Sequence, residues 1–542
     1  MQPRTPTATR PISWKDDFSI SPLYTSSDLD PFGDKNDEIR RCISTPSSSV
    51  SLPTPALSGS TSDSSDLNTD ESDKLLVKPD STTHYVPRRV HRIQRHTSEH
   101  VALWLTYAVS SVLSLAVVLC FLPLALFQTA VRNHTDKNRR GSDHIPKNDQ
   151  EWEETKEQIT HDEAYYARHW GYSCEAYDIT TQDGYVLRMY RINKKEADIK
   201  GKRAVLLGHG LFQCSGDFVL NEDKSLAFVL ADQGYDVWLG NNRATATLDH
   251  TTLSHEDPEF WDWGIKELAL YDFTAMIDHV RQATDSDKIA YIGHSQGNAQ
   301  GFVALALQPE IATKLSCFIA LAPAVFSGSL TSTFPIRLLI NLDDRWYKLI
   351  FGTTAFLPLM MTAQKWLPPR PFSVLAYSMF AYLFSWWDRH WLRRRKVKYF
   401  QFTPRLVSSR LIADWLEGWG RRGVCLHLTG SNGSHADLKN RLPSEKVPLA
   451  VFYGSDDYLV SGERFIRTFA GYEKYDASGH FIPDPVTDHA ENNLFPMLNL
   501  IHVERIPDYE HMDTIWGHDN LDTTYPGIFK VLSSSAQWDN KM

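Results

Sequence analysis

Hydrophobic and polar residues divide the chain into three regions. The first 87 residues are dominated by Ser, Thr, Asp and Pro, and their apolar residues are too few to offset the entropy of ordering. An uncharged run rich in Leu, Val and Ala follows at 101–131. Beyond residue 160, short apolar runs alternate with longer segments of helical periodicity. The pattern predicts a disordered tail, a membrane helix and a folded domain.

The apolar run 101–131 is long enough to cross a membrane, because a bilayer core needs about 20 apolar residues in a helix. Basic residues flank it in nearly equal numbers, so the positive-inside rule does not decide its orientation. They are Arg88, Arg89, Arg92 and Arg95 before it, and Arg132, Lys137, Arg139 and Arg140 after it. Two glycosylation sequons, at Asn133 and Asn432, lie on the C-terminal side of the run and favour a lumenal or exterior hydrolase domain. We therefore expect the N-terminal tail to be cytoplasmic. We expect a single-pass protein of the plasma membrane, endoplasmic reticulum or lipid droplet.

Short apolar runs in the folded domain predict strands separated by helices. Such strands form a parallel sheet covered on both faces. The runs are 204–207, 236–239, 288–292, 317–321, 449–453 and 500–506. A hairpin is expected from 174–181 and 186–191, around the Asp183-Gly184 turn. The fold class is therefore α/β, with a mostly parallel central sheet.

The segment 323–446 is much longer than a normal connection between two strands. It is crowded with aromatic residues and predicts an apolar helical cap or lid, part of whose surface contacts lipid. The aromatic residues are Trp346, Tyr347, Phe351, Phe356, Trp366, Phe372, Tyr377, Phe380, Tyr382, Phe384, Trp386, Trp387 and Trp391. A basic run at 393–396 follows them. This run is either a solvated helix face or a contact with anionic lipid.

These features define the expected domains. In chain order they are a disordered tail (1–87), a basic membrane flank (88–100), a transmembrane helix (101–131), a linker (132–160), the first part of the core (161–322), the cap (323–446) and the second part of the core (447–542).

The segment Gly293-His-Ser-Gln-Gly297 carries the main candidate for chemistry. An apolar strand precedes it and a helical segment follows it, which is the context of a nucleophile elbow. Glycine is needed at Gly293 and Gly297 because a side chain at either position would collide with the neighbouring strand or helix. Ser295 would then project its hydroxyl from the edge of the sheet.

A serine hydroxyl needs a histidine base, a carboxylate that orients the base, and donors for an oxyanion. We assign the oxyanion donors to the backbones of Leu211 and Gln296, because residue 211 follows a His-Gly turn at the end of a strand. The base is His511, which follows the last strand. Asp456 and Asp457 both follow the strand before it, and spacing does not choose between them. The order Ser, Asp, His is that of α/β-hydrolases.

Charge and cysteine content limit the other functions. The net charge of −10 argues against a nucleic-acid partner. The six cysteines are scattered and form no metal or redox motif, so we expect no metal and no cofactor. A disulfide is possible among Cys174, Cys214, Cys317 and Cys425, but the sequence does not pair them.

Several segments together resemble the acid lipase family of α/β-hydrolases. They are 171–187, 209–213, 234–243, 260–263, 293–297 and 509–513. With a membrane helix ahead of the hydrolase domain, the chain is most similar in organisation to the membrane-anchored fungal steryl ester hydrolases. The resemblance implies that Asp457 rather than Asp456 is the triad acid, beside Ser295 and His511. After Asn241-Asn242-Arg243 the family usually has glycine, whereas this chain has Ala244. This departure concerns the conformation of the loop.

The sequence thus predicts a membrane-anchored serine esterase that cleaves steryl esters to sterol and fatty acid through an acyl-enzyme. Its expected partners are a steryl ester or other neutral lipid ester and the surface of a membrane or lipid droplet. One alternative is a triacylglycerol lipase, or another lipid-ester hydrolase or acyltransferase, that uses the same triad. A second alternative is a catalytically silent membrane protein that binds lipid. No protein partner is indicated.

Overall fold

The computed structural model describes residues 92–93, 95–139, 156–195, 201–420, 446–467, 469, 474–475, 481–482 and 497–535. The expected disordered tail, the expected sequon at Asn432, and Cys425 lie outside the described residues. The chain forms two units, 1–86 with 473–484, and 87–472 with 485–542. In the first, β8 (Lys474–Tyr475) and β9 (Phe481–Ile482) pair antiparallel. All features described below belong to the second unit.

A single eight-stranded sheet forms the centre of this unit, in the order β1-β2-β4-β3-β5-β6-β7-β10. The strands are β1 (Tyr172–Thr180), β2 (Val186–Lys194), β3 (Ala204–Gly208), β4 (Asp236–Leu239), β5 (Ile289–His294), β6 (Leu315–Leu321), β7 (Val447–Gly454) and β10 (Leu498–Ile506). β1, β2 and β4 pair antiparallel, whereas the pairs from β4 to β10 are parallel. This confirms the predicted fold class.

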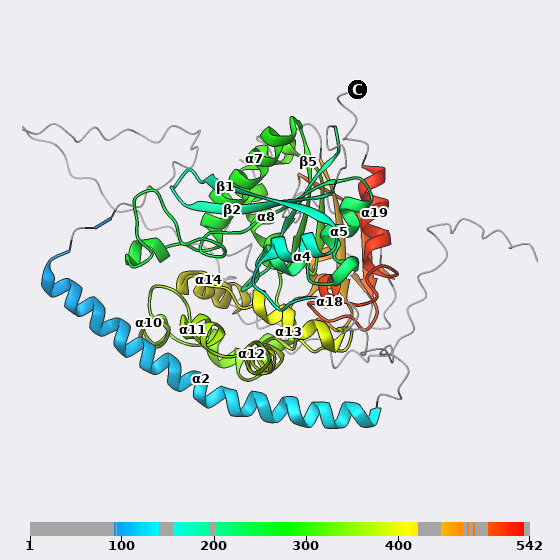
Figure 1. Cartoon of the computed structure of the whole chain (residues 1–542). Helices are drawn as coiled ribbons and strands as arrows, with labels where there is room; N and C mark the ends of the chain where they lie inside the picture. Colours follow the sequence, from blue (N-terminus) through cyan, green and yellow to red (C-terminus); the bar gives the residue numbers. More distant parts are fainter. Residues whose placement is uncertain are drawn as a thin grey trace, which may run out of the picture. The chain divides into compact units, whose positions relative to one another are not determined.

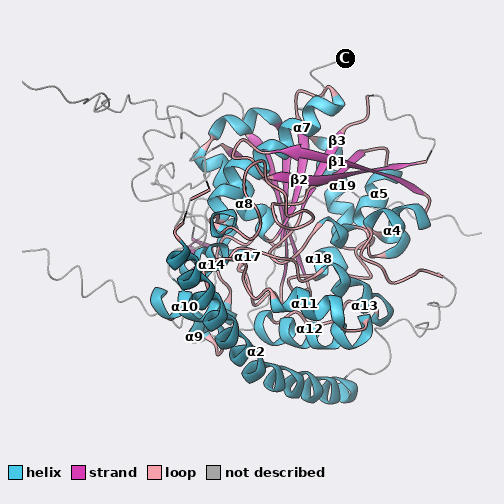
Figure 2. Ribbon diagram, turned by 60° about the vertical axis from the view of Figure 1, so that its left-hand side comes forward, coloured by secondary structure: helices cyan, strands magenta, loops and turns pink. Residues whose placement is uncertain are grey.

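Helices cover both faces of the sheet, with α7 and α8 on one side and α5 and α19 on the other (Figures 1 and 2). The core helices are α4 (Glu163–His169), α5 (Leu226–Asp232), α6 (Ile265–Glu267), α7 (Thr274–Thr284), α8 (Gln296–Leu307), α17 (Gly462–Ile466), α18 (Asp513–Trp516) and α19 (Thr524–Ser534). Shorter turns are η2 (Ser215–Phe218), η3 (Glu222–Lys224), η4 (Pro258–Trp261), η5 (Leu268–Phe273), η6 (Pro309–Lys314) and η7 (Ser329–Ser332). Every residue of β3 to β6 is buried, which explains their uninterrupted apolar sequences.

The insertion between β6 and β7 is helical. Its helices are α9 (Ile336–Ile340), α10 (Asp344–Phe351), α11 (Leu359–Trp366), α12 (Pro369–Phe384), α13 (Arg393–Phe402) and α14 (Ser409–Gly420). Most of its aromatic residues pack inside the protein, including Phe372 and Phe380 of α12. Trp346 and Trp366 remain 59% and 79% exposed. Any contact of the cap with lipid is therefore made by the smaller, exposed part of its apolar residues.

Most of the basic run 393–396 does not form the solvated or lipid-facing surface that we expected, although Arg393 is exposed. Arg394 and Arg395 both form ion pairs with Glu222 of η3, at 2.7 Å. Lys396 forms an ion pair with Asp388. Because Glu222 belongs to the core, the ion pairs of Arg394 and Arg395 fasten α13 to it. The expectation was wrong because it considered only the charge run and not a distant acidic partner.

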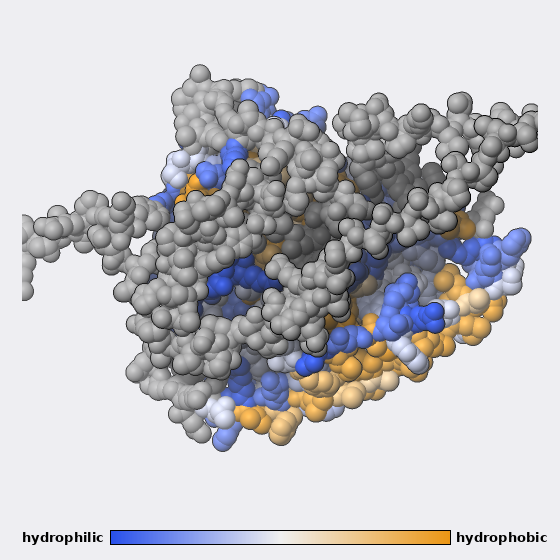
Figure 3. All heavy atoms as spheres, turned by 180° about the vertical axis from the view of Figure 1, so that it is seen from behind, coloured by the Kyte–Doolittle hydropathy of each residue, from blue (hydrophilic) through white to orange (hydrophobic). Residues whose placement is uncertain are grey.

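Helix α2 (Thr97–Arg139) contains the predicted apolar run and has Pro123 in its interior. Its length and composition qualify it as a candidate membrane span. It forms a long apolar ridge on the surface of the molecule (Figure 3). Cys120 on this helix is a free cysteine, as are Cys174, Cys214 and Cys317 in the hydrolase core.

Candidate active site

Ser295 stands between β5 and α8 in a strained backbone conformation, with φ 53° and ψ −114°. Both flanking glycines are required by close contacts. A Cβ atom on Gly293 would lie 2.4 Å from Asn298 Oδ1, and one on Gly297 would lie 2.5 Å from the carbonyl oxygen of Gly208. The start of α8 is thus pressed against the end of β3. This packing holds the serine at the carboxyl edge of the parallel strands.

A continuous hydrogen-bonded chain joins three distant parts of the sequence. Ser295 Oγ lies 2.8 Å from His511 Nε2, and His511 Nδ1 lies 2.8 Å from Asp457 Oδ2. All three side chains are nearly inaccessible to solvent. In this arrangement the carboxylate fixes the imidazole tautomer, and the free nitrogen faces the hydroxyl proton.

The structure brings Asp457, and not Asp456, to the histidine. Asp457 Oδ1 also accepts hydrogen bonds from the backbone N–H groups of Leu459 and Val460, both at 3.0 Å. Asp456 points elsewhere and pairs with Arg389 at 3.4 Å. The directions of these two adjacent side chains therefore favour Asp457 as the candidate acid of the triad.

The two backbones assigned to the oxyanion hole lie beside Ser295. Gln296 is the first residue of α8, so its N–H is not used by the hydrogen bonds of the helix. Leu211 lines the same pocket as Ser295. A Cβ atom on the preceding Gly210 would lie 3.0 Å from the Cβ of Ser295. Glycine at this position lets the loop after β3 lie directly against the serine.

Gln213 connects three parts of the site, a role that the sequence did not predict. Its Oε1 accepts the Gly210 N–H at 2.6 Å and lies 2.9 Å from His294 Nδ1. Its Nε2 lies 3.3 Å from the sulfur of Met512, beside His511. The residue belongs to the segment 209–213 that carried the resemblance. A polar residue in an apolar turn was the available signal, but it does not reveal these partners.

Two further histidines near the serine are kept neutral. Burial lowers the pKa of His209 to about 4, and this ring accepts the Asn242 N–H at 3.2 Å. Burial and the neighbouring His511 lower the pKa of His294 well below its usual range. These rings hold the loops in place as neutral hydrogen-bonding groups. Only His511 faces the serine hydroxyl within hydrogen-bond distance among the described histidines.

Aromatic side chains of the cap close the pocket above the serine. The ring of Trp386 lies nearly parallel to that of His511, with 6.0 Å between their centres, and stacks on Phe380 at 4.9 Å. Phe384, Trp415 and Trp419 also line the pocket, together with Leu211, Phe212, Gln213, Ser295, Ala324, Leu459 and Val460. The cavity that these side chains enclose is only about 20 Å³, far below the size of a ligand pocket. A large ester therefore requires the cap to move.

The Asn-Asn-Arg loop, where the sequence departs from the family pattern, is held by buried charges. Arg243 is 1% exposed and donates hydrogen bonds to Asp183 and Asp272, each at 2.7 Å. Its guanidinium lies 3.9 Å from the ring centre of Tyr185. Ala244 takes a φ of 60°, the left-handed conformation that favours glycine. The loop thus has the backbone conformation of a glycine position, although the residue is alanine.

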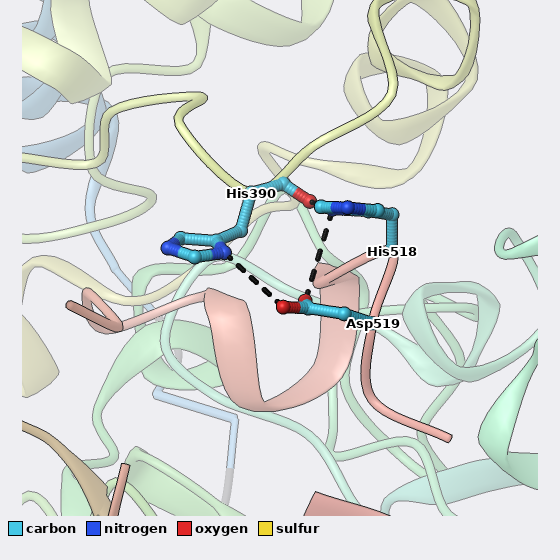
Figure 4. Close-up of side chains that lie close together, drawn as sticks. All are labelled: His390, His518 and Asp519. Atoms are coloured by element: carbon cyan, nitrogen blue, oxygen red, sulfur yellow. Dashed lines mark hydrogen bonds and ion pairs between the residues drawn. The ribbon is translucent and has the colours of Figure 1, made fainter. Parts of the chain in front are cut away.

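His390, His518 and Asp519 meet where the cap loop after α12 contacts the segment after His511 (Figure 4). His390 Nδ1 lies 3.5 Å from Asp519 Oδ2, and His518 Nδ1 donates to the carbonyl oxygen of His390 at 2.8 Å. Asp519 Oδ1 accepts the Tyr509 hydroxyl at 2.6 Å. Because these hydrogen bonds already use His518 Nδ1 and Asp519 Oδ1, we interpret the cluster as an ion-pair network rather than a metal site.

Comparison with known proteins places this geometry in a family. Residues 164–222 match the partial α/β-hydrolase lipase region, and residues 203–353 match the α/β-hydrolase fold. Sterol esterase 2 of Saccharomyces cerevisiae is 32% identical over 410 residues, which cover 68% of this chain and 71% of the relative. The chain belongs to the acid lipase family of α/β-hydrolases. It is a lipase or esterase of that family.

Two mammalian members of the acid lipase family show similar identity over more of their own length. Lysosomal acid lipase/cholesteryl ester hydrolase of Homo sapiens is 32% identical, and the match covers 67% of this chain and 88% of the relative. Gastric triacylglycerol lipase of Mus musculus is 31% identical, with 67% and 90% covered. Family membership alone therefore does not choose between steryl esters and triacylglycerols.

Proposed function

We propose that this protein hydrolyses steryl esters to sterol and fatty acid through an acyl-enzyme on Ser295. The observation that carries the proposal is the hydrogen-bonded chain from Ser295 through His511 to Asp457, with both distances at 2.8 Å. In such a chain the histidine removes the serine proton as the oxygen attacks the ester carbonyl. The carboxylate stabilises the imidazolium that forms.

The remaining steps use groups already in place. The backbone N–H groups of Leu211 and Gln296 stabilise the oxyanion of the tetrahedral intermediate. His511 then gives its proton to the departing sterol oxygen, and an acyl ester remains on Ser295. Water attacks this ester by the same sequence of proton transfers, which releases the fatty acid and restores the serine.

An apolar substrate is supported by the pocket walls. Aromatic rings of the cap surround the serine, and such walls favour a large apolar ester over a charged one. The name of the yeast relative, Sterol esterase 2, supports a sterol as the alcohol. Helix α2 supports attachment of the enzyme to the membrane or lipid surface from which such a substrate is taken.

A triacylglycerol lipase is the second candidate. Its support is the 31% identity to gastric triacylglycerol lipase, close to the 32% identity to Sterol esterase 2, since the same triad and oxyanion groups would serve either ester. The two candidates differ only in the alcohol that leaves. The substrate therefore has to be tested directly.

The test is hydrolysis of cholesteryl oleate and triolein in detergent micelles by the full chain and by Ser295→Ala. A parallel reaction with free sterol and an acyl donor detects acyl transfer. We expect turnover of cholesteryl oleate that falls by about 10⁶ in the variant, as in other triad knockouts. Retention of more than a tenth of the rate would reject Ser295 as the nucleophile. Cleavage of triolein alone would select the second candidate, and silence on both esters would favour a lipid-binding protein.

A further inference from the structure

Helix α2 has one face against the cap and one face toward the outside. Ser114 Oγ donates a hydrogen bond to the carbonyl oxygen of Ile350 in α10 at 2.6 Å. Phe121 packs edge-on against Phe334, with 5.9 Å between the ring centres. The buried positions recur at helical spacing and include three small polar side chains. They are Ser110, Ser114, Phe121, Ala125 and Thr129.

Both ends of this helix are tied to the hydrolase domain. Just before the helix, Arg95 Nη1 donates to Glu259 Oε2 at 3.2 Å, in η4 of the core. Near its other end, Arg132 Nη2 donates to Glu510 Oε1 at 3.4 Å, next to His511. The guanidinium of Arg132 also lies 3.9 Å from the ring centre of Trp387. The helix therefore runs along the domain instead of leading away from it.

These two attachments are not compatible with a helix that crosses a bilayer. Arg95 and Arg132 are 37 residues apart (132 − 95), which corresponds to about 55 Å of helix, against a hydrocarbon core of about 30 Å. A crossing helix would place the two arginines on opposite sides. Their partners, Glu259 and Glu510, belong to one compact unit, and this unit would then have to reach both sides of the bilayer.

The outward face of α2 is apolar along its length. Trp104, Val112, Leu119 and Phe127 are 67%, 68%, 59% and 70% exposed. In Figure 3 the apolar side chains form a continuous band along this edge of the molecule. Neighbouring cap segments expose Phe334, Leu338, Trp346 and Leu349. An apolar surface of this extent requires a partner that removes it from water.

We propose that α2 lies in the plane of a single phospholipid leaflet, with both of its ends on the same side as the hydrolase domain. The occupant of the apolar face is the hydrocarbon of that leaflet. An in-plane helix needs one apolar face and one face that is satisfied by protein or water, as α2 has. Two tethers to one domain, about 55 Å apart along the helix, are not expected of a spanning helix.

The charges that flank the helix support the same topology. Four basic residues precede the apolar run and four follow it, so neither end is marked as cytoplasmic by the positive-inside rule. For a crossing helix this balance leaves the orientation undecided. For a helix whose two ends face the same anionic headgroups, equal charge at both ends is the expected pattern. From the sequence we expected the N-terminal tail and the hydrolase domain on opposite sides of the membrane. The in-plane helix instead places both on the same side.

This topology would also bring the pocket to the lipid. Tyr382 of α12 contacts Phe121 of α2, and Phe384 at the end of α12 lines the pocket of Ser295. One cap helix therefore separates the leaflet from the serine. An ester dissolved among the lipid chains would enter by displacement of α12, without crossing water.

A protease-protection experiment tests the topology. The full chain, carrying Ser295→Ala and different epitopes at its two termini, is synthesised with sealed microsomes and digested from outside. We expect both epitopes to be lost without detergent while the protein resists extraction by alkaline carbonate. Loss of one epitope while the other is protected until detergent is added would overturn the proposal, whereas equal behaviour of the two epitopes supports it. Because the variant is inactive, this result is independent of the proposed hydrolysis.

A depth measurement gives a second, independent test. A fluorescent amino acid is placed at Val112, Leu119 or Phe127, and its quenching by lipids brominated at different depths is compared. An in-plane helix predicts nearly equal depths for all three positions. A crossing helix would place them at clearly different depths, because they span about 22 Å along the axis. A probe at the buried Ser114 is the matched control and should be quenched least.

The inference rests on the proposed attachment through α2, and the two can fail separately. Release of the protein by carbonate would remove both the attachment and the in-plane helix. Retention with one protected epitope would remove the in-plane helix and leave the attachment. Retention on phospholipid-covered triolein droplets as well as on vesicles is expected, because a single leaflet suffices for binding. Failure to bind droplets would contradict the proposal.

Discussion

Replacement of Gln213 by leucine tests whether the loop after β3 is positioned by a single buried side chain. Gln213 is 1% exposed, and its Oε1 accepts the Gly210 N–H at 2.6 Å. His294 Nδ1 lies 2.9 Å from the same oxygen, and its Nε2 lies 3.1 Å from the carbonyl oxygen of His511. Gln213→Leu leaves the Gly210 N–H buried without an acceptor and removes the polar neighbour of His294. A buried donor without a partner costs about 1–3 kcal/mol, so we expect the free energy of unfolding to fall by about 2 kcal/mol.

The effect on catalysis follows from the position of Leu211, two residues before Gln213. Loss of one oxyanion donor costs about 10²–10³ in kcat. A loop that is displaced but not removed should approach the lower limit, so we expect kcat to fall by about 10². KM should change little, because the donor acts on the transition state and not on the bound ester. The assay is steady-state hydrolysis of a soluble short-chain ester, together with urea unfolding.

Gln213→Glu is the matched control. Burial raises the pKa of a glutamic acid at this position, so its neutral form keeps a carbonyl oxygen that can accept the Gly210 N–H. This variant should recover most of the lost kcat. A folded Gln213→Leu protein with kcat within twofold of the parent would refute the reasoning. Equal damage in the two variants would also refute it, because the acceptor would then not be the cause.

Two further predictions concern buried charges. Arg243→Lys keeps the charge but loses the two-pronged contact with Asp183 and Asp272, and should destabilise the fold by about 3 kcal/mol in urea unfolding; an unchanged midpoint would contradict this. Burial alone would lower the pKa of His390, but its interaction with Asp519 raises it overall. The stabilisation of the fold by charged His390 is therefore complete below about pH 6.5, the pKa of histidine in the unfolded chain. It is lost as the pH rises through the raised pKa of His390 in the folded state. Burial opposes ionisation of Asp519, but His390 and other partners lower its pKa to about 2. The contribution of ionised Asp519 to the stability of the fold is therefore lost only as the pH falls toward 2. The melting temperature of His390→Asn should fall below that of the parent at pH 5 and approach it at pH 9; an equal difference at both pH values would argue against the ion pair.

The sheet could be predicted from the sequence because its strands are short, apolar and bounded by turns. The bounds predicted for β4, 236–239, are those observed. Ser295, His511 and an aspartate at 456 or 457 could be proposed because each follows a strand end, where the carboxyl edges of a parallel sheet meet. The choice of Asp457 came from the family resemblance. The distances between these side chains could not be predicted, since they depend on loops that the pattern does not describe.

The errors and omissions concern contacts between distant segments. The run 393–396 was read as a surface because its partner, Glu222, lies more than 150 residues away in the sequence. Gln213 was overlooked for the same reason, since two of its partners, His294 and Met512, lie 81 and 299 residues away in the sequence. The apolar pattern of α2 indicated a membrane helix, but its length could not reveal that both ends bind one domain. Local periodicity predicts elements, whereas these features arise from their packing.

The most direct test of Ser295 as the nucleophile is covalent labelling by a fluorophosphonate, followed by peptide mass analysis. Activation of the serine by His511 predicts one adduct, on Ser295, whose rate of formation falls by at least about 10³ in His511→Ala although the serine is intact. Ser295→Ala should carry no adduct at the site. An adduct on another residue, or an unchanged labelling rate in His511→Ala, would contradict the proposed catalytic triad.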